Sequence, residues 1–251
     1  MYRCGVSCTV GFLMKGLIIV PAYNEESSIY SVLEKIKRTC SEEDLIVIDD
    51  GSRDRTAEIV RQAGVACVSH PVNLGYVRGL QTGIFLADER HYDYLVFLDA
   101  DGQHDPHDIA ALKACAFGPE RPDIVIGSRF ISDKHYQAPM GRRLGMMLFS
   151  VLTRWFGGRR IYDTTSGFKL LRRRAFQLVS GQVLGDFHAE MIIFGLVAGL
   201  RIQEVPVVVS ERTSGTSMYS WLQALLYPVK TILAILVLWP EARRGRRVAN
   251  T

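Results

Sequence analysis

The chain has 251 residues, of which 48% are hydrophobic and 22% charged, an ordinary composition for a folded protein that excludes extended disorder away from the ends. The formal net charge is only +4, but the positive charge is concentrated in short arginine clusters at Arg142–Arg143, Arg159–Arg160, Arg172–Arg174 and Arg243–Arg247. Such clusters suit phosphate groups or anionic lipid better than a general nucleic-acid tract, so no nucleic-acid partner is expected.

Residues 1–13 are predicted to be an extension that precedes the folded part. They end before a second methionine, Met14, and their apolar portion runs into the first strand without a credible cleavage site, which disfavours a signal peptide. The five cysteines are an odd number without zinc-ligand spacing, and are interpreted as reduced thiols in a cytoplasmic setting. The predicted division is an extension over 1–13, an α/β domain over 14–218 and a C-terminal segment over 219–251.

Strands and helices are predicted to alternate along the first half of the chain. Short apolar runs predict the strands, and apolar residues at helical spacing predict the helices between them. The predicted strands are Leu17–Val20, Leu45–Ile48, Ala66–Val68, Tyr94–Leu98 and Ile124–Ile126, and the predicted helices begin near Ile29, Thr56, Tyr76 and Ile109. This alternation favours an α/β fold with a mostly parallel sheet and right-handed crossovers.

Carboxylates follow two of the predicted strands. Asp50 comes after the second strand, while Asp99 and Asp101 come after the fourth and are followed by Gln103. Ligands bind at the carboxyl edge of open α/β sheets, and hard oxygen ligands suit magnesium or manganese that carries a phosphate-bearing substrate. Taken alone, the Asp-x-Asp turn is equally consistent with residues that only cap the following helix.

Six short motifs occur along the chain. They are Val20–Glu25 (VPAYNE), Asp49–Thr56 (DDGSRDRT), Asn73–Gly75 (NLG), Asp99–Gly102 (DADG), Gly127–Arg129 (GSR) and Asp163–Phe168 (DTTSGF). In this order and spacing they resemble the family 2 glycosyltransferases, in particular the dolichyl- or polyprenyl-phosphate sugar synthase branch, over about residues 17–217. The resemblance implies a Rossmann-like GT-A fold, a UDP- or GDP-linked sugar donor, a divalent cation (Mg²⁺ or Mn²⁺) and inversion at the anomeric carbon.

The resemblance also implies roles for the acidic residues. A divalent cation stabilises the negative charge that builds on a departing diphosphate. Asp101 and Gln103 match its contacts, and Asp99 matches a contact to the nucleotide or the metal. The residues that match contacts to the base and ribose are Pro21, Tyr23, Glu25 and Asp50.

Three further polar residues near these motifs are expected to be structural. Asp49 and Asp54 are interpreted as local turn and helix caps rather than ligand contacts. His104 is expected to face solvent or to bond within its loop, because a hard oxygen site does not need an imidazole ligand.

The middle of the chain is predicted to serve the acceptor. Gly141–Arg160 is an apolar helix bracketed by arginines, and Trp155 beside Arg154 favours a membrane interface. A core helix with basic ends is the alternative. Arg129 and Arg143 match positions that face the acceptor phosphate in the resembling synthases, and an anionic acceptor needs such partners.

Asp163–Phe168 is expected to pack under the active site, and Lys169, like Arg172–Arg174, is expected to be surface charge. Glu190 and Asp186 lie near the start of a further predicted helix. Either residue is a candidate general base if the acceptor is a hydroxyl, and either is also explained by the helix dipole alone. A lipid phosphate is already anionic and needs no base, and the arginines and apolar segments favour it.

Ile202–Val209 is predicted to be an edge strand, because Pro206 cannot donate to a sheet ladder. The segment that follows resembles the loop that closes over the donor diphosphate in the synthases. Arg212 is expected to contact the diphosphate, with Ser214 and Ser217 as weaker contacts. A Ser/Gly linker is the alternative.

The C-terminal segment is predicted to lie on the membrane. Only Thr231–Trp239 is an uninterrupted apolar run, and spanning a bilayer takes about 20 residues. A helix on or partly in the membrane, with Arg243–Arg247 against anionic head groups, is therefore expected. Whether a small membrane protein partner or a homo-oligomer completes the anchor is left open by the sequence.

Together these features predict an inverting, metal-dependent transferase that moves one sugar from a nucleotide sugar to a polyprenyl or dolichyl phosphate at the cytoplasmic face of the membrane. The first alternative is transfer to a hydroxyl of a glycan or glycolipid in cell-surface polysaccharide synthesis. The second is a non-catalytic nucleotide-sugar-binding scaffold, which the intact acidic motifs disfavour.

Overall fold

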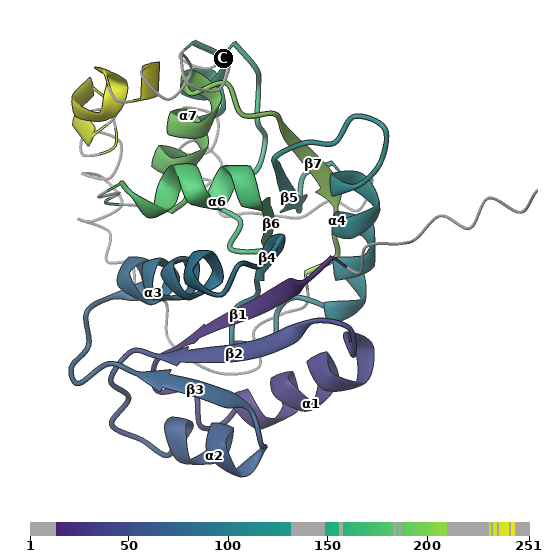
Figure 1. Ribbon diagram of the computed structural model, residues 1–251, viewed down its shortest axis with the longest axis vertical. Helices are drawn as coiled ribbons and strands as arrows, with labels where there is room; N and C mark the ends of the chain where they lie inside the picture. The colour runs from purple at the N-terminus through teal and green to yellow at the C-terminus, as the bar shows by residue number, and fades with distance from the viewer. Residues whose placement is uncertain are drawn as a thin grey trace, which may run out of the picture.

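The computed structural model describes residues 14–131, 149–155, 158–182, 185, 187–209, 231, 233–234, 236–240 and 242–243. Within these residues a seven-stranded sheet lies between two layers of helices (Figure 1). The helices are α1 (Ile29–Thr39), α2 (Thr56–Gln62), α3 (Tyr76–Glu89), the short 3-10 helix η1 (Pro106–Asp108), α4 (Ile109–Ala116), α6 (Arg173–Ser180) and α7 (Ala189–Val197).

The sheet is mostly parallel, as predicted. Its strands are β1 (Gly16–Ala22), β2 (Asp44–Asp49), β3 (Ala66–Ser69), β4 (Tyr94–Phe97), β5 (Ile124–Ser128), β6 (Lys169–Arg172) and β7 (Ile202–Pro206). Their spatial order is β3-β2-β1-β4-β6-β5-β7. Among these strands β6 alone is antiparallel to its neighbours, β4 and β5.

Each face of the sheet carries its own apolar core. Alternate residues of a strand point to opposite faces, so in β1 Leu17 and Ile19 join one core, while Ile18 and Val20 join the other. The first core is covered by α3, α6 and α7, and the second by α1, α2 and α4. Burial on both faces explains why β1 is an unbroken apolar run rather than an alternating one.

The edge position predicted for the last strand is confirmed. β7 ends at Pro206, and among the residues that the structure describes it pairs with β5 on one side only. The chain then returns toward the centre, where Val209 forms an isolated antiparallel bridge with His104. The strand is shorter than the predicted run to Val209 because its partner β5 ends at Ser128, whose carbonyl accepts the last ladder hydrogen bond, from the N–H of Val207.

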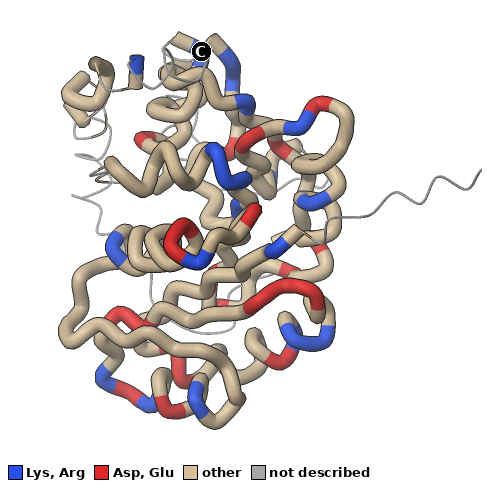
Figure 2. Tube along the Cα trace, viewed as in Figure 1, with Lys and Arg blue, Asp and Glu red and all other residues tan. Residues whose placement is uncertain are grey.

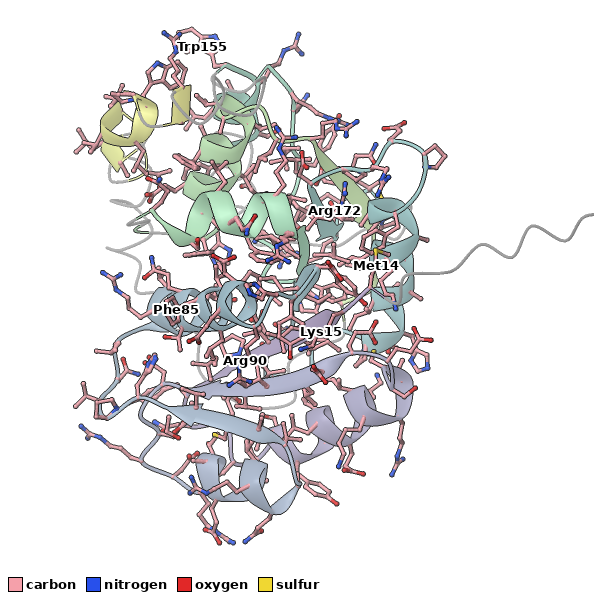
Figure 3. The ribbon with its side chains drawn as sticks, in the orientation of Figure 1. Met14, Lys15, Phe85, Arg90, Trp155 and Arg172 are labelled. Atoms are coloured by element: carbon pink, nitrogen blue, oxygen red, sulfur yellow. The ribbon has the colours of Figure 1, made fainter. Side chains whose placement is uncertain are left out.

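Residues 149–155 are helical and present two different faces. Phe149 and Thr153 are buried, whereas Val151 points outward and Trp155 is 83% exposed at the top of the view in Figure 3. Figure 2 shows positions of both charge signs interspersed along the described chain. No helix within the described residues is both long enough and apolar enough to cross a bilayer.

Candidate active site

The six sequence motifs lie on loops at one edge of the sheet. Because β1 to β5 are mutually parallel, their carboxyl ends share this edge; Ala22 of β1, for example, pairs with Asp49 of β2. β6 runs the other way, so its first residue, Lys169, lies here too, opposite Phe97 of β4. This is the edge at which open α/β sheets bind ligands.

Hydrogen bonds join the loop after β1 to the loop after β2. The backbone N–H groups of Asn24 and Glu25 donate to Ser52 Oγ at 2.9 Å and to Thr56 Oγ1 at 2.8 Å. In return, the N–H of Arg53 donates to Asn24 Oδ1 at 2.8 Å. The first two motifs therefore form one interlocked unit.

The local roles predicted for Asp49 and Asp54 are confirmed. Asp49 Oδ1 accepts a hydrogen bond from the N–H of Ser52 at 3.2 Å. Asp54 Oδ1 accepts from both the N–H and the hydroxyl of Thr56, the first residue of α2. Both carboxylates thus hold the turn that carries the second motif.

The residues expected to contact the base and ribose surround this unit. Pro21 is buried in β1, whereas Tyr23 and Glu25 are partly exposed beyond its end. The Glu25 carboxylate accepts from Ser28 Oγ at 2.8 Å. Nucleotide contact by these three residues stays a prediction.

Asp50 is buried and already engaged by the chain. Its carboxylate accepts hydrogen bonds from the N–H groups of Leu74 and Gly75, at 2.9 and 2.7 Å, and contacts His70 Nδ1 at 2.7 Å. The other ring nitrogen of His70 lies 2.9 Å from Thr82 Oγ1 of α3. Asp50 therefore joins the second motif to the third.

Asp99 lies where β4 ends and is held from two sides. The hydroxyl of Tyr76, the first residue of α3, donates to Asp99 Oδ1 at 2.9 Å. On the other side the backbone of Gly167 approaches so closely that a Cβ there would lie 2.4 Å from Asp99 Oδ2. The third, fourth and sixth motifs therefore meet at this carboxylate.

Asp101 and His104 lie on the turn that follows. Asp101 Oδ1 accepts from the N–H of Gln103 at 3.0 Å. Of the two placements expected for His104, facing solvent or bonding within its loop, the first is wrong, since only 7% of the residue is exposed and its ring stacks on Phe168 at 5.0 Å. Burial lowers the pKa of His104, although the charges of Asp99 and Asp101 act in the opposite direction.

The donor set at this turn fits a hard divalent cation. Asp99 and Asp101 offer carboxylate oxygens and Gln103 an amide oxygen, which are the atoms that Mg²⁺ and Mn²⁺ prefer. Within the described residues no group of three or more His, Cys, Asp or Glu side chains is placed to hold a metal ion. Mg²⁺ commonly binds through one or two carboxylates plus substrate phosphates, so the two carboxylates of this turn would hold a cation together with a bound diphosphate.

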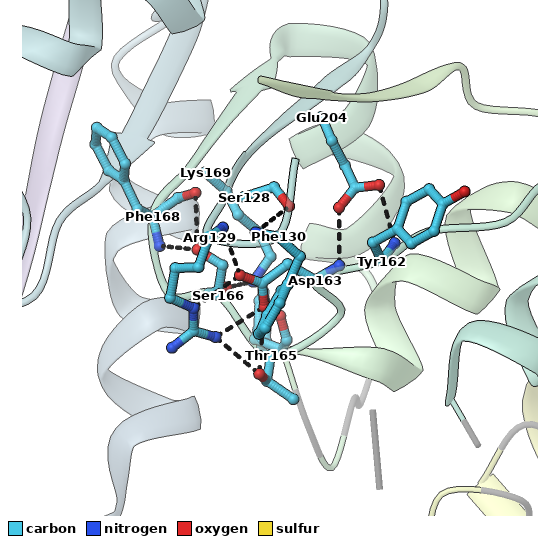
Figure 4. A network of polar contacts seen from close by, with 11 residues as sticks. Ser128, Arg129, Phe130, Tyr162, Asp163, Thr165, Ser166, Phe168, Lys169 and Glu204 are labelled. Carbon is cyan, nitrogen blue, oxygen red and sulfur yellow. Dashed lines mark hydrogen bonds and ion pairs between the residues drawn. The ribbon is translucent and has the colours of Figure 1, made fainter. Parts of the chain in front are cut away.

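Arg129 directly follows β5 and is held in place by the buried carboxylate of Asp163. Its Nε and Nη2 donate to Asp163 Oδ2 and Oδ1 at 2.8 and 2.7 Å, and Nη2 also donates to Thr165 Oγ1 at 2.9 Å (Figure 4). Asp163 and Thr165 belong to the same loop as Gly167, whose backbone lies against Asp99. This loop therefore links the guanidinium to the acidic turn.

Asp163 is anchored in turn by β7. Glu204 accepts from the N–H groups of Tyr162 and Asp163 at 2.9 and 2.8 Å (Figure 4). Burial tends to raise the pKa of Asp163, but the hydrogen bonds and charge of Arg129 outweigh it and hold the pKa below its usual range. Burial raises the pKa of Glu204 despite these two backbone donors.

The expectation that Lys169 is surface charge is wrong. Lys169 is 2% exposed, and its ammonium group donates to the carbonyl oxygens of Ser166 and Phe187. The Asp163–Phe168 loop, which leads directly into Lys169, is largely buried, in agreement with the prediction that this loop packs under the site. Arg172–Arg174, by contrast, make the surface contacts that were expected.

The remaining predicted residues fall into two groups. Glu190 is 3% exposed at the start of α7, accepts from the N–H of Gly185 at 3.1 Å, and lines a small apolar cavity with Leu238 and Trp239. The others lie outside the described residues: Arg143, Asp186, Arg212, Ser214 and Ser217.

The described part of the C-terminal segment packs against α7. Leu238 and Trp239 contact the core, and Ala242 is buried. Leu236 and Val237 point outward, with exposed fractions of 57% and 76%. The segment thus offers an apolar outer face while its inner face covers α7.

Sequence reasoning missed four functional neighbours. Tyr76, His70 and Glu204 each hold a motif residue, and Lys169 lies under the site. A tyrosine directly after the Asn-Leu-Gly motif was a usable signal, because the residue after that turn starts a helix at the ligand edge. The backbone partners of Glu204, and Phe187 as a partner of Lys169, are distant in sequence, which no local pattern reveals.

A mostly parallel seven-stranded sheet flanked by helices, with an acidic turn at its carboxyl edge, is a GT-A-like α/β fold. The family model described as glycosyl transferase family 2 matches residues 17–179. The chain therefore belongs to glycosyl transferase family 2 and is a glycosyltransferase.

Named relatives agree with this assignment, and a solved structure shares the fold. The chain is 32% identical to an undecaprenyl-phosphate mannosyltransferase of Micrococcus luteus, over 82% of this chain and 88% of that protein. It is 29% identical to a UDP-N-acetylglucosamine–dolichyl-phosphate N-acetylglucosaminyltransferase of Methanococcus voltae, over 76% and 83%. Its fold is similar to that of Mycobacterium tuberculosis glucosyl-3-phosphoglycerate synthase, crystallised with Mn²⁺ and UDP-glucose, with a TM-score of 0.67 and 22% identity over 93% and 84%.

Proposed function

We propose that the protein transfers one sugar, with inversion, from a UDP- or GDP-linked donor to a polyprenyl or dolichyl phosphate at the cytoplasmic face of the membrane. The observation that carries this proposal is that one loop, Asp163–Phe168, holds Arg129 through Asp163 and Thr165 and places the backbone of Gly167 against Asp99 of the acidic turn. Cation-holding carboxylates and a phosphate-binding guanidinium are the two parts that such a transfer needs. Relatives named for lipid-phosphate acceptors support the choice of acceptor.

On the donor side, Pro21, Tyr23, Glu25 and Asp50 bind the nucleoside, and Asp99, Asp101 and Gln103 hold Mg²⁺ or Mn²⁺. When bound, the cation supplies Lewis-acid stabilisation of the charge on the departing diphosphate. Arg212, Ser214 and Ser217 are proposed to contact the diphosphate from a loop that excludes water.

On the acceptor side, Arg129 and Arg143 orient the lipid phosphate. Because Asp163 fixes the Arg129 guanidinium, little of its freedom has to be lost on binding. A phosphate oxygen forms a bond to the anomeric carbon as the bond from that carbon to the diphosphate oxygen breaks. The electron pair leaves with the diphosphate, and no proton has to move.

A hydroxyl acceptor is less well supported. It needs a general base, and Glu190 is buried beside Leu238 and Trp239, where the C-terminal segment covers α7. A phosphate acceptor makes no such demand.

The proposed organisation is a catalytic domain over residues 14–218 and a membrane-associated segment over 219–251, with residues 1–13 as an extension. The outward apolar side chains of Trp155, Leu236 and Val237 support contact with a membrane surface. A small membrane protein or a second copy of the chain is a proposed partner of that segment.

The test is nucleoside diphosphate release from a panel of UDP- and GDP-sugars with Mn²⁺ or Mg²⁺. Release is expected only when polyprenyl phosphate is added, and the product sugar should be labile to mild acid. Asp101→Ala should abolish release, while the matched variant Asp105→Ala, at a half-exposed cap of η1, should retain it. No turnover with any donor, or a fully active Asp101→Ala variant, contradicts the proposal.

A further inference from the structure

One turn links two of the carboxylates to which roles are assigned above. The N–H groups of Leu74 and Gly75 donate to Asp50, and the hydroxyl of the next residue, Tyr76, donates to Asp99 Oδ1. Asp50 follows β2 and Asp99 follows β4, with β1 between these strands in the sheet. The turn from β3 to α3 therefore reaches across the ligand edge.

The backbone of this turn fixes where Tyr76 begins α3. Gly75 has a φ of +93°, in the region that favours glycine, and immediately precedes the helix. Since Asp50 holds both Leu74 and Gly75, the position of the following residue is set by hydrogen bonds from another strand.

The tyrosine ring is supported from a second element. His188, directly before α7, stacks on Tyr76 with ring centroids 5.8 Å apart and an interplanar angle of 13°. A tyrosine has only two side-chain torsions, so ring stacking and the hydroxyl bond to Asp99 together define its orientation.

The Asp99 carboxylate is thereby confined between two groups. Tyr76 contacts Oδ1, and the backbone of Gly167 lies against Oδ2. A carboxylate that is already oriented loses less freedom when it binds a cation, and hydrogen-bonding partners of metal ligands commonly contribute to affinity in this way.

We propose that Tyr76 is a positioning residue whose hydroxyl orients Asp99 for the divalent cation. The proposal rests on the metal role given to Asp99 under the proposed function. The turn then has two tasks. Leu74 and Gly75 of the third motif hold Asp50, and Tyr76, the residue directly after the motif, orients Asp99 at the metal.

The variant that tests it is Tyr76→Phe, which removes the hydroxyl and keeps the ring that stacks on His188. Thermal unfolding is followed while Mn²⁺ is titrated at a fixed saturating concentration of UDP or of GDP. The Mn²⁺ concentration that gives half of the maximal stabilisation should rise about 10-fold in the variant. In the transfer assay, the Mn²⁺ activation constant should rise in parallel, with most of the rate recovered at saturating Mn²⁺.

The matched control is Tyr92→Phe. The Tyr92 hydroxyl donates to Asp44 Oδ2 at 2.6 Å, so this variant also loses a tyrosine–aspartate hydrogen bond, but at the opposite end of β2. The Mn²⁺ concentration that gives half of the maximal stabilisation, the Mn²⁺ midpoint, should be the same in this variant as in the wild type. An unchanged midpoint in Tyr76→Phe, or an equal rise in both variants, overturns the role of Tyr76. Absence of any Mn²⁺-dependent stabilisation of the wild type with either diphosphate instead overturns the proposed metal centre, and the inference with it.

Discussion

Arg129 donates two parallel hydrogen bonds, of 2.8 and 2.7 Å, to the carboxylate of Asp163, 34 residues further along the chain, at the carboxyl end of β5. The Asp163 side chain is fully buried, whereas that of Arg129 is 14% exposed. The carboxylate therefore depends on this guanidinium for neutralisation, while the guanidinium retains access to the ligand edge.

Arg129→Ala should lower both stability and activity. Removing one partner of a buried ion pair leaves an uncompensated charge, which costs about 3–5 kcal/mol, and loss of the phosphate-binding group should slow transfer by about 10²–10³-fold. Urea unfolding and nucleoside diphosphate release measure the two effects. Arg38→Ala, which breaks an exposed pair with Glu34, should change neither; equal stability of Arg129→Ala and wild type would contradict the prediction.

Asp163 should contribute to the acid sensitivity of the fold. Its pKa is below the usual 3.8, because the hydrogen bonds and charge of Arg129 outweigh the effect of burial. For a depressed pKa, the stabilisation is fully present above the unfolded-state pKa and is lost as pH falls through the folded-state value. The free energy of unfolding of Asp163→Asn should therefore be lower at neutral pH and fall less steeply below pH 3.8 than that of the wild type. Parallel slopes in this acid range would show that Asp163 does not titrate as described.

Gly167→Ala should impair the metal site without unfolding the protein. The added methyl group would lie 2.4 Å from Asp99 Oδ2 and 3.0 Å from Asp99 Cγ, so the carboxylate has to rotate. The expected result is a loss of transfer activity of about 10–100-fold, measured with far-UV circular dichroism as the check on folding. Gly181→Ala, where a Cβ meets no atom within 4 Å, is the control and should keep wild-type activity; wild-type activity in Gly167→Ala would argue against confinement of Asp99.

The outward face of the C-terminal segment should determine membrane binding. Leu236→Glu combined with Val237→Glu places two charges at exposed positions, so sedimentation with vesicles containing anionic lipid should fall about 10-fold or more, while the melting temperature stays unchanged. Phe85→Glu alters an equally exposed apolar residue on α3 and should leave sedimentation unaffected. Equal vesicle binding by all three proteins would exclude this face as the membrane contact.

The sequence was sufficient to predict the parts of the fold that depend on local pattern. Apolar runs located β1 to β5, and Pro206 correctly placed β7 at the sheet edge. Asp49 and Asp54 each accept from a backbone N–H two or three residues further along the chain, so these local contacts followed from position, whereas the second contact of Asp54, with the N–H of Glu26, did not. The acidic turn after β4 was located because it directly follows an apolar run.

Features created by long-range packing could not be predicted in this way. Lys169 begins a strand that ends in Arg172, and this charged pattern was read as surface. Burial of the lysine is compensated by carbonyl groups of Ser166 and Phe187, and the latter lies 18 residues away. The antiparallel direction of β6 likewise depends on pairing with β4, a strand far earlier in the chain.

The insertion of β6 between β4 and β5 has a consequence for protein synthesis. When the ribosome has delivered the chain only as far as residue 160, β1 to β4 can pair, but β5 has neither of its neighbours, β6 and β7. Closing the sheet then requires contacts of high sequence separation, which form slowly and leave strand edges exposed in the meantime. The nascent chain thus passes through a stage in which β4 and β5 present unpaired edges, the stage at which chaperones have most to protect.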